Sequence, residues 1–198
     1  MESISDYQKR TYKDKANSLL TEFLSNHQVK DAIDLGCGSG NETVYMIKKG
    51  IKVLSVDKHL NKNFILDRLT DNEKKNVVFM ENSFENVILP KTDLIVAFFS
   101  IPFCSRDEFD NLWNKIYDSV NENGYFIGQL FGDRGVWNPS LNVNTFTKEK
   151  IKEYLKLYKI ILFEEKEFIR KSDNKKWHYF DIIAKKTKWK HVIDKVFM

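Results

Sequence analysis

A glycine-rich segment in the first quarter of the chain has the composition of a ligand-binding loop. It reads Asp34-Leu35-Gly36-Cys37-Gly38-Ser39-Gly40 and follows a short apolar stretch. Glycines at alternate positions leave the backbone bare, so that a ligand can lie directly on it. The acid before the first glycine would repel a pyrophosphate, which the dinucleotide motif G-x-G-x-x-G binds at a helix N-terminus. The segment therefore favours a ligand that carries positive charge, such as a sulfonium or an ammonium group.

A second acid follows at the end of another apolar stretch. Val53-Leu54-Ser55-Val56 leads into Asp57, roughly 20 residues after the first glycine, which is the separation expected for ribose recognition. A carboxylate there can accept hydrogen bonds from both ribose hydroxyls, and Lys58 adjoins it. The alternative is that Asp57 caps the helix that follows, since Asp is favoured at that position in any case.

The elements that carry these residues alternate in kind along the chain. Apolar stretches predict strands at 32–35, 51–56, 76–80, 93–98, 125–131, 159–169 and 177–185, and helical spacing predicts helices at 15–27, 41–49, 60–70, 106–120 and 147–158. Alternating strands and helices imply a parallel sheet with right-handed crossovers. Gly50 and Thr147 are expected to end and begin helices, and an apolar stripe begins at Phe109 in the helix at 106–120. Asn123-Gly124 predicts a turn into the fifth strand, and Ser172-Asp173-Asn174 predicts a closing hairpin. We therefore expect an α/β fold, doubly wound, with a mostly parallel seven-stranded sheet, helices on both faces and an antiparallel C-terminal strand.

The length and the composition of the chain suit one folded domain. The chain has 198 residues, 42% hydrophobic and 30% charged, and no linker or repeat divides it. We expect a single domain over 1–198, with an N-terminal helix at about 15–27, a core at about 30–186 and a short tail that packs as an extra element. Because no apolar run is long enough for a bilayer, no secretory signal is visible and only two cysteines occur, we expect a cytoplasmic protein without a membrane partner.

The glycine-rich segment and its preceding strand resemble the first motif of the class I S-adenosylmethionine-dependent methyltransferases, and the resemblance extends over roughly 30–186. The stretches Gln129-Leu130-Phe131-Gly132-Asp133-Arg134 and Trp177-His178 are similar to small bacterial methyltransferases of the TehB-like type. The resemblance implies that S-adenosyl-L-methionine is the co-substrate and that S-adenosyl-L-homocysteine is released.

The resemblance also implies which residues meet the cofactor. The loop after the third strand, Glu81-Asn82-Ser83-Phe84, would read the adenine, although a helix cap at Asn82 or Ser83 explains it equally well. Ser100-Ile101-Pro102-Phe103 departs from the motif of amino-group methyltransferases and is expected only to line the pocket. The expected cofactor-binding residues are Asp34, Gly36, Cys37, Gly38, Ser39, Gly40, Asp57, Lys58, Asn82, Ser83, Phe84, Phe98 and Phe99.

Methyl transfer from a sulfonium needs mainly alignment, and a general base helps if the acceptor must lose a proton. The candidates for that base are His178, Asp133 and Tyr12. His178 can equally be a surface histidine of a strand, and Asp133 can simply pair with Arg134. The histidines and cysteines show no zinc spacing, so no metal is expected.

We expect a small-molecule acceptor, because little of the chain lies outside the core. The alternatives are a methyltransferase that acts on RNA or protein, indicated by the basic residues after position 148, and an NAD-dependent oxidoreductase. Lysines alternate with acids in that basic stretch, which favours a solvated surface over a nucleic-acid interface. The acceptor, the atom methylated and the oligomeric state do not follow from the sequence.

Overall fold

A seven-stranded sheet forms the centre of the molecule. The computed structural model describes residues 3–137 and 143–187. The strands are β1 (Asp31–Leu35), β2 (Lys52–Asp57), β3 (Val77–Glu81), β4 (Thr92–Phe98), β5 (Val120–Phe131), β6 (Tyr158–Arg170) and β7 (Lys175–Lys186). They lie in the order β3-β2-β1-β4-β5-β7-β6. The first five are parallel, and β7 pairs antiparallel with both β5 and β6. The expected sheet is confirmed.

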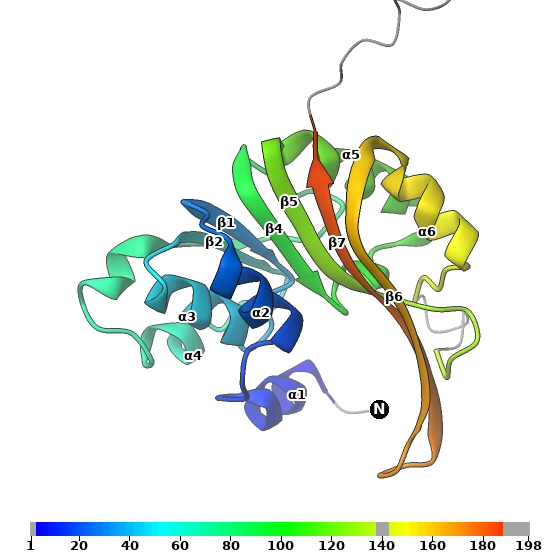
Figure 1. The fold of residues 1–198 in the computed structure, drawn as a ribbon. Helices are drawn as coiled ribbons and strands as arrows, with labels where there is room; N and C mark the ends of the chain where they lie inside the picture. Colours follow the sequence, from blue (N-terminus) through cyan, green and yellow to red (C-terminus); the bar gives the residue numbers. More distant parts are fainter. Residues whose placement is uncertain (1–2, 138–142, 188–198) are drawn as a thin grey trace, which may run out of the picture.

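Helices cover both faces of the sheet (Figure 1). On one face, α2 (Ser18–Asn26), α3 (Asn41–Lys48) and the short α4 (Lys62–Leu66) contribute to an apolar cluster with alternate residues of the central strands. On the other face, α5 (Phe109–Ser119) and α6 (Lys148–Tyr154) contribute to a second cluster. The central strands are mostly apolar because both faces of the sheet are covered there.

Sequence signals at the ends of helices are confirmed. Thr147 caps α6, since its side chain accepts a hydrogen bond from the N–H of Lys150. Gly50 follows α3 with a φ of +82°, the left-handed conformation that glycine adopts after a helix. The two signals thus mark the start of α6 and the end of α3.

Two features differ from expectation. Helix α1 (Ile4–Thr11) precedes the expected first helix; its residues are mostly polar, so it has no apolar stripe by which to be found. Strand β5 begins at Val120 rather than at 125. Asn123 has a φ of +65°, and the pairing register with β4 shifts there, so Asn123-Gly124 forms an irregularity within the strand instead of a turn before it.

The carboxyl ends of the parallel strands form the edge where the loops of interest meet. Helix α1 lies beyond this edge, and so does the tip of the β6–β7 hairpin (Figure 1). Among the described residues, no helix is both long enough and apolar enough to cross a membrane. The tail at 189–198, expected as a short extra element, falls outside the described residues.

Candidate functional site

The glycine-rich loop connects β1 to α3 and presents bare backbone. Gly36, Gly38 and Gly40 have φ values of +82°, +52° and +75°. A Cβ added to Gly36 would lie 2.2 Å from the Cβ of Ser100, and one added to Gly40 would lie 2.2 Å from Cγ1 of Ile65. A Cβ on Gly38 would meet nothing within 4 Å. Gly36 and Gly40 therefore allow Ser100 and Ile65 to pack directly against the loop, whereas the space next to Gly38 is open.

Asp57 lies against this loop, as the spacing of the two acids predicted. Its Oδ2 accepts a hydrogen bond from the N–H of Gly38 at 2.9 Å, and its Oδ1 accepts one from the N–H of His59 at 2.8 Å. The capping alternative is wrong, because the following helix begins at Lys62 after Asn61 and the bond to His59 closes a local turn. Asp57 remains partly exposed at the end of β2, so its free lone pairs can still accept hydrogen bonds from a ligand. Lys58 follows in the turn and is exposed.

Asp34 takes a different position from the one expected of it. Only 3% of the residue is exposed, and its Oδ2 accepts a hydrogen bond from the hydroxyl of Thr43 at 2.6 Å. That hydroxyl also lies 2.6 Å from Oγ of Ser55, so the carboxylate is enclosed by β1, β2 and α3. It lies underneath the loop and does not line its open side.

Burial has a large electrostatic consequence at this position. Desolvation, followed by repulsion from Glu42, raises the pKa of Asp34 from 3.8 to about 8. Asp57 adds a smaller repulsion. Desolvation likewise raises the pKa of the neighbouring Cys37 thiol well above its ordinary value. The carboxyl of Asp34 is therefore buried, and that of Glu42 half-buried, beside a loop whose predicted ligand is cationic.

The loop after β3 meets the glycine-rich loop through Phe84. The ring carbon Cζ of Phe84 lies 3.1 Å from the Cβ position of Gly36, and the N–H of Asn82 donates to the backbone oxygen of Asp57 at 3.1 Å. The side chains of Asn82 and Ser83 hydrogen-bond within a local turn, partly through Asn86. The structure thus brings this loop beside the other two, with the polar side chains engaged in capping it.

The N-terminal segment covers the same edge. The hydroxyls of Thr11 and Ser39 are hydrogen-bonded to one another, and Asn41 donates to the backbone oxygen of Thr11 at 2.9 Å. Tyr12 packs on Phe64 with 4.7 Å between the ring centroids. Tyr12 is therefore close to the glycine-rich loop, which the sequence pattern of α1 did not indicate.

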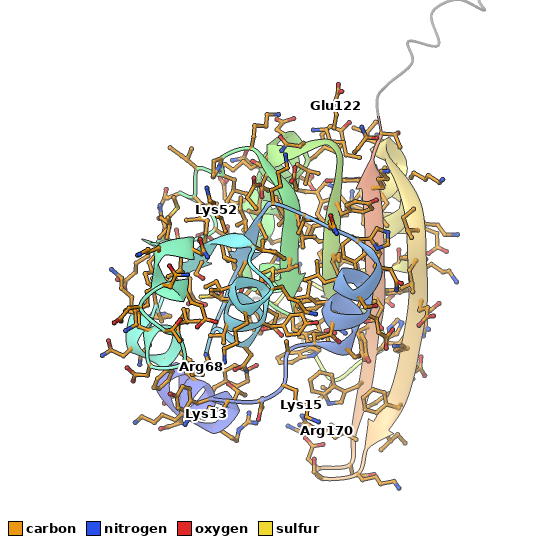
Figure 2. All side chains as sticks on the ribbon, turned by 60° about the vertical axis from the view of Figure 1, so that its left-hand side comes forward. Lys13, Lys15, Lys52, Arg68, Glu122 and Arg170 are labelled. Atoms are coloured by element: carbon orange, nitrogen blue, oxygen red, sulfur yellow. The ribbon has the colours of Figure 1, made fainter. Side chains whose placement is uncertain are left out.

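Arg68 also holds the loop, on the side of the N-terminal segment. Its guanidinium donates to the backbone oxygen of Ser39 and to Oδ1 of Asn41, and it lies over the ring of Tyr12 at 5.1 Å. Figure 2 shows Arg68 on the same side of the molecule as α1. Arg68 lies in the expected charged helix at 60–70, but no spacing in the sequence connected it with the loop.

The other two candidate bases lie elsewhere along this edge, at the ends of β5 and β7. His178 is fully buried. Its Nδ1 accepts a hydrogen bond from the N–H of Arg134 at 3.0 Å, so Nε2 carries the proton and donates to Glu165 at 3.0 Å. Asp133 is exposed and lies 3.7 Å from Nδ1 of His178. Because both ring nitrogens are occupied, His178 is arranged to hold the end of β5 and is poorly placed to take a proton from an acceptor.

A row of hydrogen-bonded polar side chains crosses the face of the sheet that α2 covers. The sequence did not predict it. Asn17 donates to Oε1 of Gln129 at 3.0 Å, and Gln129 donates to Oδ1 of Asp181 at 2.6 Å. Lys166 pairs with the other oxygen of Asp181, of which 3% is exposed. An acid within the apolar run Phe180 to Ala184 was the available signal, since a buried charge in a strand requires partners.

A surface depression lies at the opposite edge of the sheet and is unrelated to these loops. The residues that line it include Asp31, Lys52, Lys75 and Lys91, near the amino ends of the strands. Figure 2 shows Lys52 and Glu122 toward that end, and Lys13 and Arg170 toward the other. Ligands of open α/β sheets bind at the carboxyl ends of the strands, and the glycine-rich loop lies there.

Comparison with known proteins agrees with this geometry. Residues 32–124 match a family model described as a methyltransferase domain. Over 140 residues the chain is 26% identical to the probable S-adenosyl-L-methionine-dependent methyltransferase TehB of Haemophilus influenzae (strain 10810), a match that covers 67% of this chain and 47% of that protein. The chain thus spans about half the length of this curated relative.

Two solved structures share the fold. The crystal structure of TehB from Haemophilus influenzae has a TM-score of 0.74 and 20% identity, covering 93% of this chain and 68% of that one. A Burkholderia thailandensis 1,6-didemethyltoxoflavin-N1-methyltransferase, solved with 1,6-didemethyltoxoflavin and S-adenosylhomocysteine, has a TM-score of 0.70 and 18% identity, covering 93% and 87%.

The strand order and the glycine-rich loop are those of the class I S-adenosylmethionine-dependent methyltransferase fold, and residues 32–124 match a methyltransferase domain. The co-substrate of this class is S-adenosylmethionine, and the three positive-φ glycines, the open side of Gly38 and the carboxylate of Asp57 suit it.

Proposed function

We propose that this protein transfers the methyl group of S-adenosylmethionine to a small-molecule acceptor at the carboxyl ends of β1, β2 and β4. The observation that carries the proposal is the open backbone at Gly38, held by Asp57 and flanked by Phe84. In the reaction, a lone pair of the acceptor forms a bond to the methyl carbon while the carbon–sulfur bond breaks and its electrons pass to sulfur.

The roles of the binding residues follow from their positions. The backbone of Gly36, Cys37, Gly38, Ser39 and Gly40 holds the methionine and ribose portions, because side chains are absent or turned away there. Asp57 accepts hydrogen bonds from the ribose hydroxyls with the lone pairs that its two N–H partners leave free, and Lys58 adjoins it.

The adenine lies beside the loop after β3. Phe84 lies against Gly36 and offers a ring face, and the backbone around Asn82 and Ser83 offers polar groups. Phe98 and Phe99 end β4 and separate the cofactor from the acceptor. Asp34 lies beneath the loop, where a bound cation would favour the ionised form of its carboxyl without touching it.

The acceptor is small because the chain covers its own site. Thr11, Ser39 and Asn41 fasten the end of α1 over the glycine-rich loop, so a large substrate would have to displace it. No base is required for an acceptor that attacks with a neutral lone pair. Where a proton must leave, Tyr12 and Asp133 are nearer to solvent than His178, both of whose nitrogens are engaged.

The test combines binding with turnover. We expect S-adenosylhomocysteine to raise the melting temperature, and we expect a screen of small acceptors with methyl-labelled S-adenosylmethionine to yield a labelled product. The control is Asp57→Asn, which should reduce both signals. Turnover of RNA or protein substrates, with none of any small acceptor, would refute the small-molecule proposal.

A further inference from the structure

Aromatic rings gather at the carboxyl end of the sheet, next to the glycine-rich loop. We call this group the aromatic wall; it consists of Phe99, Phe103, Phe131, Trp137, Trp177 and Tyr179. Phe99 stacks on Phe131 at 5.1 Å between centroids, and Trp137 lies 4.3 Å from Phe131. The planes of Trp137 and Trp177 are nearly perpendicular at 5.9 Å. The rings come from three segments that are far apart in the sequence, namely 99–103, 131–137 and 177–179.

The wall adjoins the proposed cofactor loop through Phe99 and Ser100. Phe99 follows β4 with a φ of +51°, a conformation that is strained for an aromatic residue and is often stored at functional sites. This backbone directs its ring toward Phe131, Trp177 and Tyr179. The next residue, Ser100, packs directly against Gly36. The wall therefore begins one residue away from the loop that holds the methyl donor.

Two polar atoms within the wall have no partner. The indole N–H groups of Trp137 and Trp177 are buried, and neither donates a hydrogen bond to any part of the chain that the structure describes. An unpaired buried donor is unfavourable, and such groups in folded proteins call for an explanation. The indole of Trp113, in contrast, donates to the backbone oxygen of Tyr154 at 2.9 Å. A ligand that accepts hydrogen bonds would supply what Trp137 and Trp177 lack.

We propose that the aromatic wall is the acceptor site and that it takes a flat heteroaromatic molecule whose ring nitrogen or carbonyl groups accept hydrogen bonds from Trp137 and Trp177. The proposal rests on the methyltransferase function proposed above. Ring faces and edges favour a flat aromatic partner, because offset-stacked and edge-to-face contacts add to simple burial. The two N–H groups then select, among flat molecules, those with acceptor atoms at the ring edge.

The chemistry of transfer fits such an acceptor. A ring nitrogen holds a lone pair that can form the new bond to the methyl carbon as the carbon–sulfur bond breaks. The other acceptor atoms of the ring stay hydrogen-bonded to the wall and fix its orientation. This alignment is what an in-line displacement requires.

The experiment compares two flat probes of equal size. Quinoxaline has two ring nitrogens that accept hydrogen bonds, and naphthalene has none. Ligand-detected NMR titrations would use the protein saturated with S-adenosylhomocysteine. We expect quinoxaline to bind at least about threefold more tightly than naphthalene, from one or two net hydrogen bonds. In the double variant Trp137→Phe, Trp177→Phe, that preference should disappear while the affinity for naphthalene stays within about twofold.

Trp113→Phe is the matched control, because it removes an indole N–H that already has a partner. It should lower the melting temperature and leave the probe preference unchanged, whereas the wall variants should lose the preference with little loss of stability. Equal binding of the two probes to the natural protein, or a preference that survives in the double variant, would overturn the inference. Failure of the methyltransferase proposal has a different signature, namely no thermal stabilisation of the natural protein by S-adenosylhomocysteine.

Discussion

Replacement of Asp34 by asparagine should stabilise the protein without its cofactor at alkaline pH. Burial, with repulsion from Glu42, raises the pKa of Asp34 from 3.8 to about 8. The folded state therefore binds this proton more tightly than the unfolded state does. The resulting stabilisation is fully present below about pH 4, is lost as the pH rises, and is gone above about pH 8.

The size of the effect follows from that shift. About four units at roughly 1.4 kcal/mol each give at most about 5–6 kcal/mol, shared with Glu42, whose pKa burial also raises. Even a quarter of this value, about 1.4 kcal/mol, corresponds to roughly 3–6 °C in melting temperature for a chain of this size. The amide of asparagine has no charge to desolvate, and it can still accept the hydrogen bond from Thr43.

The assay is thermal unfolding of both proteins at pH 5, 7 and 9 without ligand. The natural protein should lose stability across this range, and Asp34→Asn should lose less, so that the difference widens toward pH 9. Asp107→Asn, at an exposed position, controls for the removal of one negative charge. A constant difference between the natural protein and Asp34→Asn at all three pH values would refute the buried carboxylate as the cause.

Three further substitutions test the loop and its surroundings. Gly36→Ala should unfold or strongly destabilise the protein, by more than about 3 kcal/mol, because its Cβ would lie 2.2 Å from that of Ser100. Gly38→Ala, in open space at a φ of +52°, should cost only about 1–2 kcal/mol by urea unfolding; equal losses in the two would contradict this account of the loop. Asp57→Asn should weaken S-adenosylhomocysteine binding in calorimetry by about tenfold or more, since hydrogen bonds to a charged acceptor contribute about 1.5–3 kcal/mol each, and unchanged affinity would remove the ribose assignment. His178→Phe should destabilise the protein by about 1–3 kcal/mol because it removes the hydrogen bonds to the N–H of Arg134 and to Glu165, while the pH profile of methyl transfer stays as it is; loss of a titration step from that profile would restore His178 as a base.

The fold was largely predictable from the sequence because its strands and helices are strongly patterned. The apolar runs at 93–98 and 177–185 lie within sheet strands, and the stripe that begins at Phe109 faces the core. The first helix was not predictable, because α1 is held by hydrogen bonds from its end to the glycine-rich loop and carries no apolar face of its own. The start of β5 was misjudged because Asn-Gly commonly marks a turn.

The site was predictable where it depends on backbone and uncertain where it depends on side-chain partners. The glycine spacing and the acid at the end of β2 placed Gly38 and Asp57 together, as the structure confirms. The burial of Asp34 depends on Thr43, which lies nine positions further along the chain, in α3. No sequence periodicity predicts such a contact. Nor does any predict the hydrogen bonds that connect the side chains of Asn17, Gln129 and Asp181.

Binding of an adenosyl ligand to the glycine-rich loop can be measured directly by a thermal-shift titration. S-adenosylhomocysteine at about 100 times its dissociation constant should stabilise the protein by about 2.7 kcal/mol, roughly 5–10 °C for a chain of this size. NAD at the same concentration should produce no shift. A shift with NAD, or none with S-adenosylhomocysteine, would contradict the account.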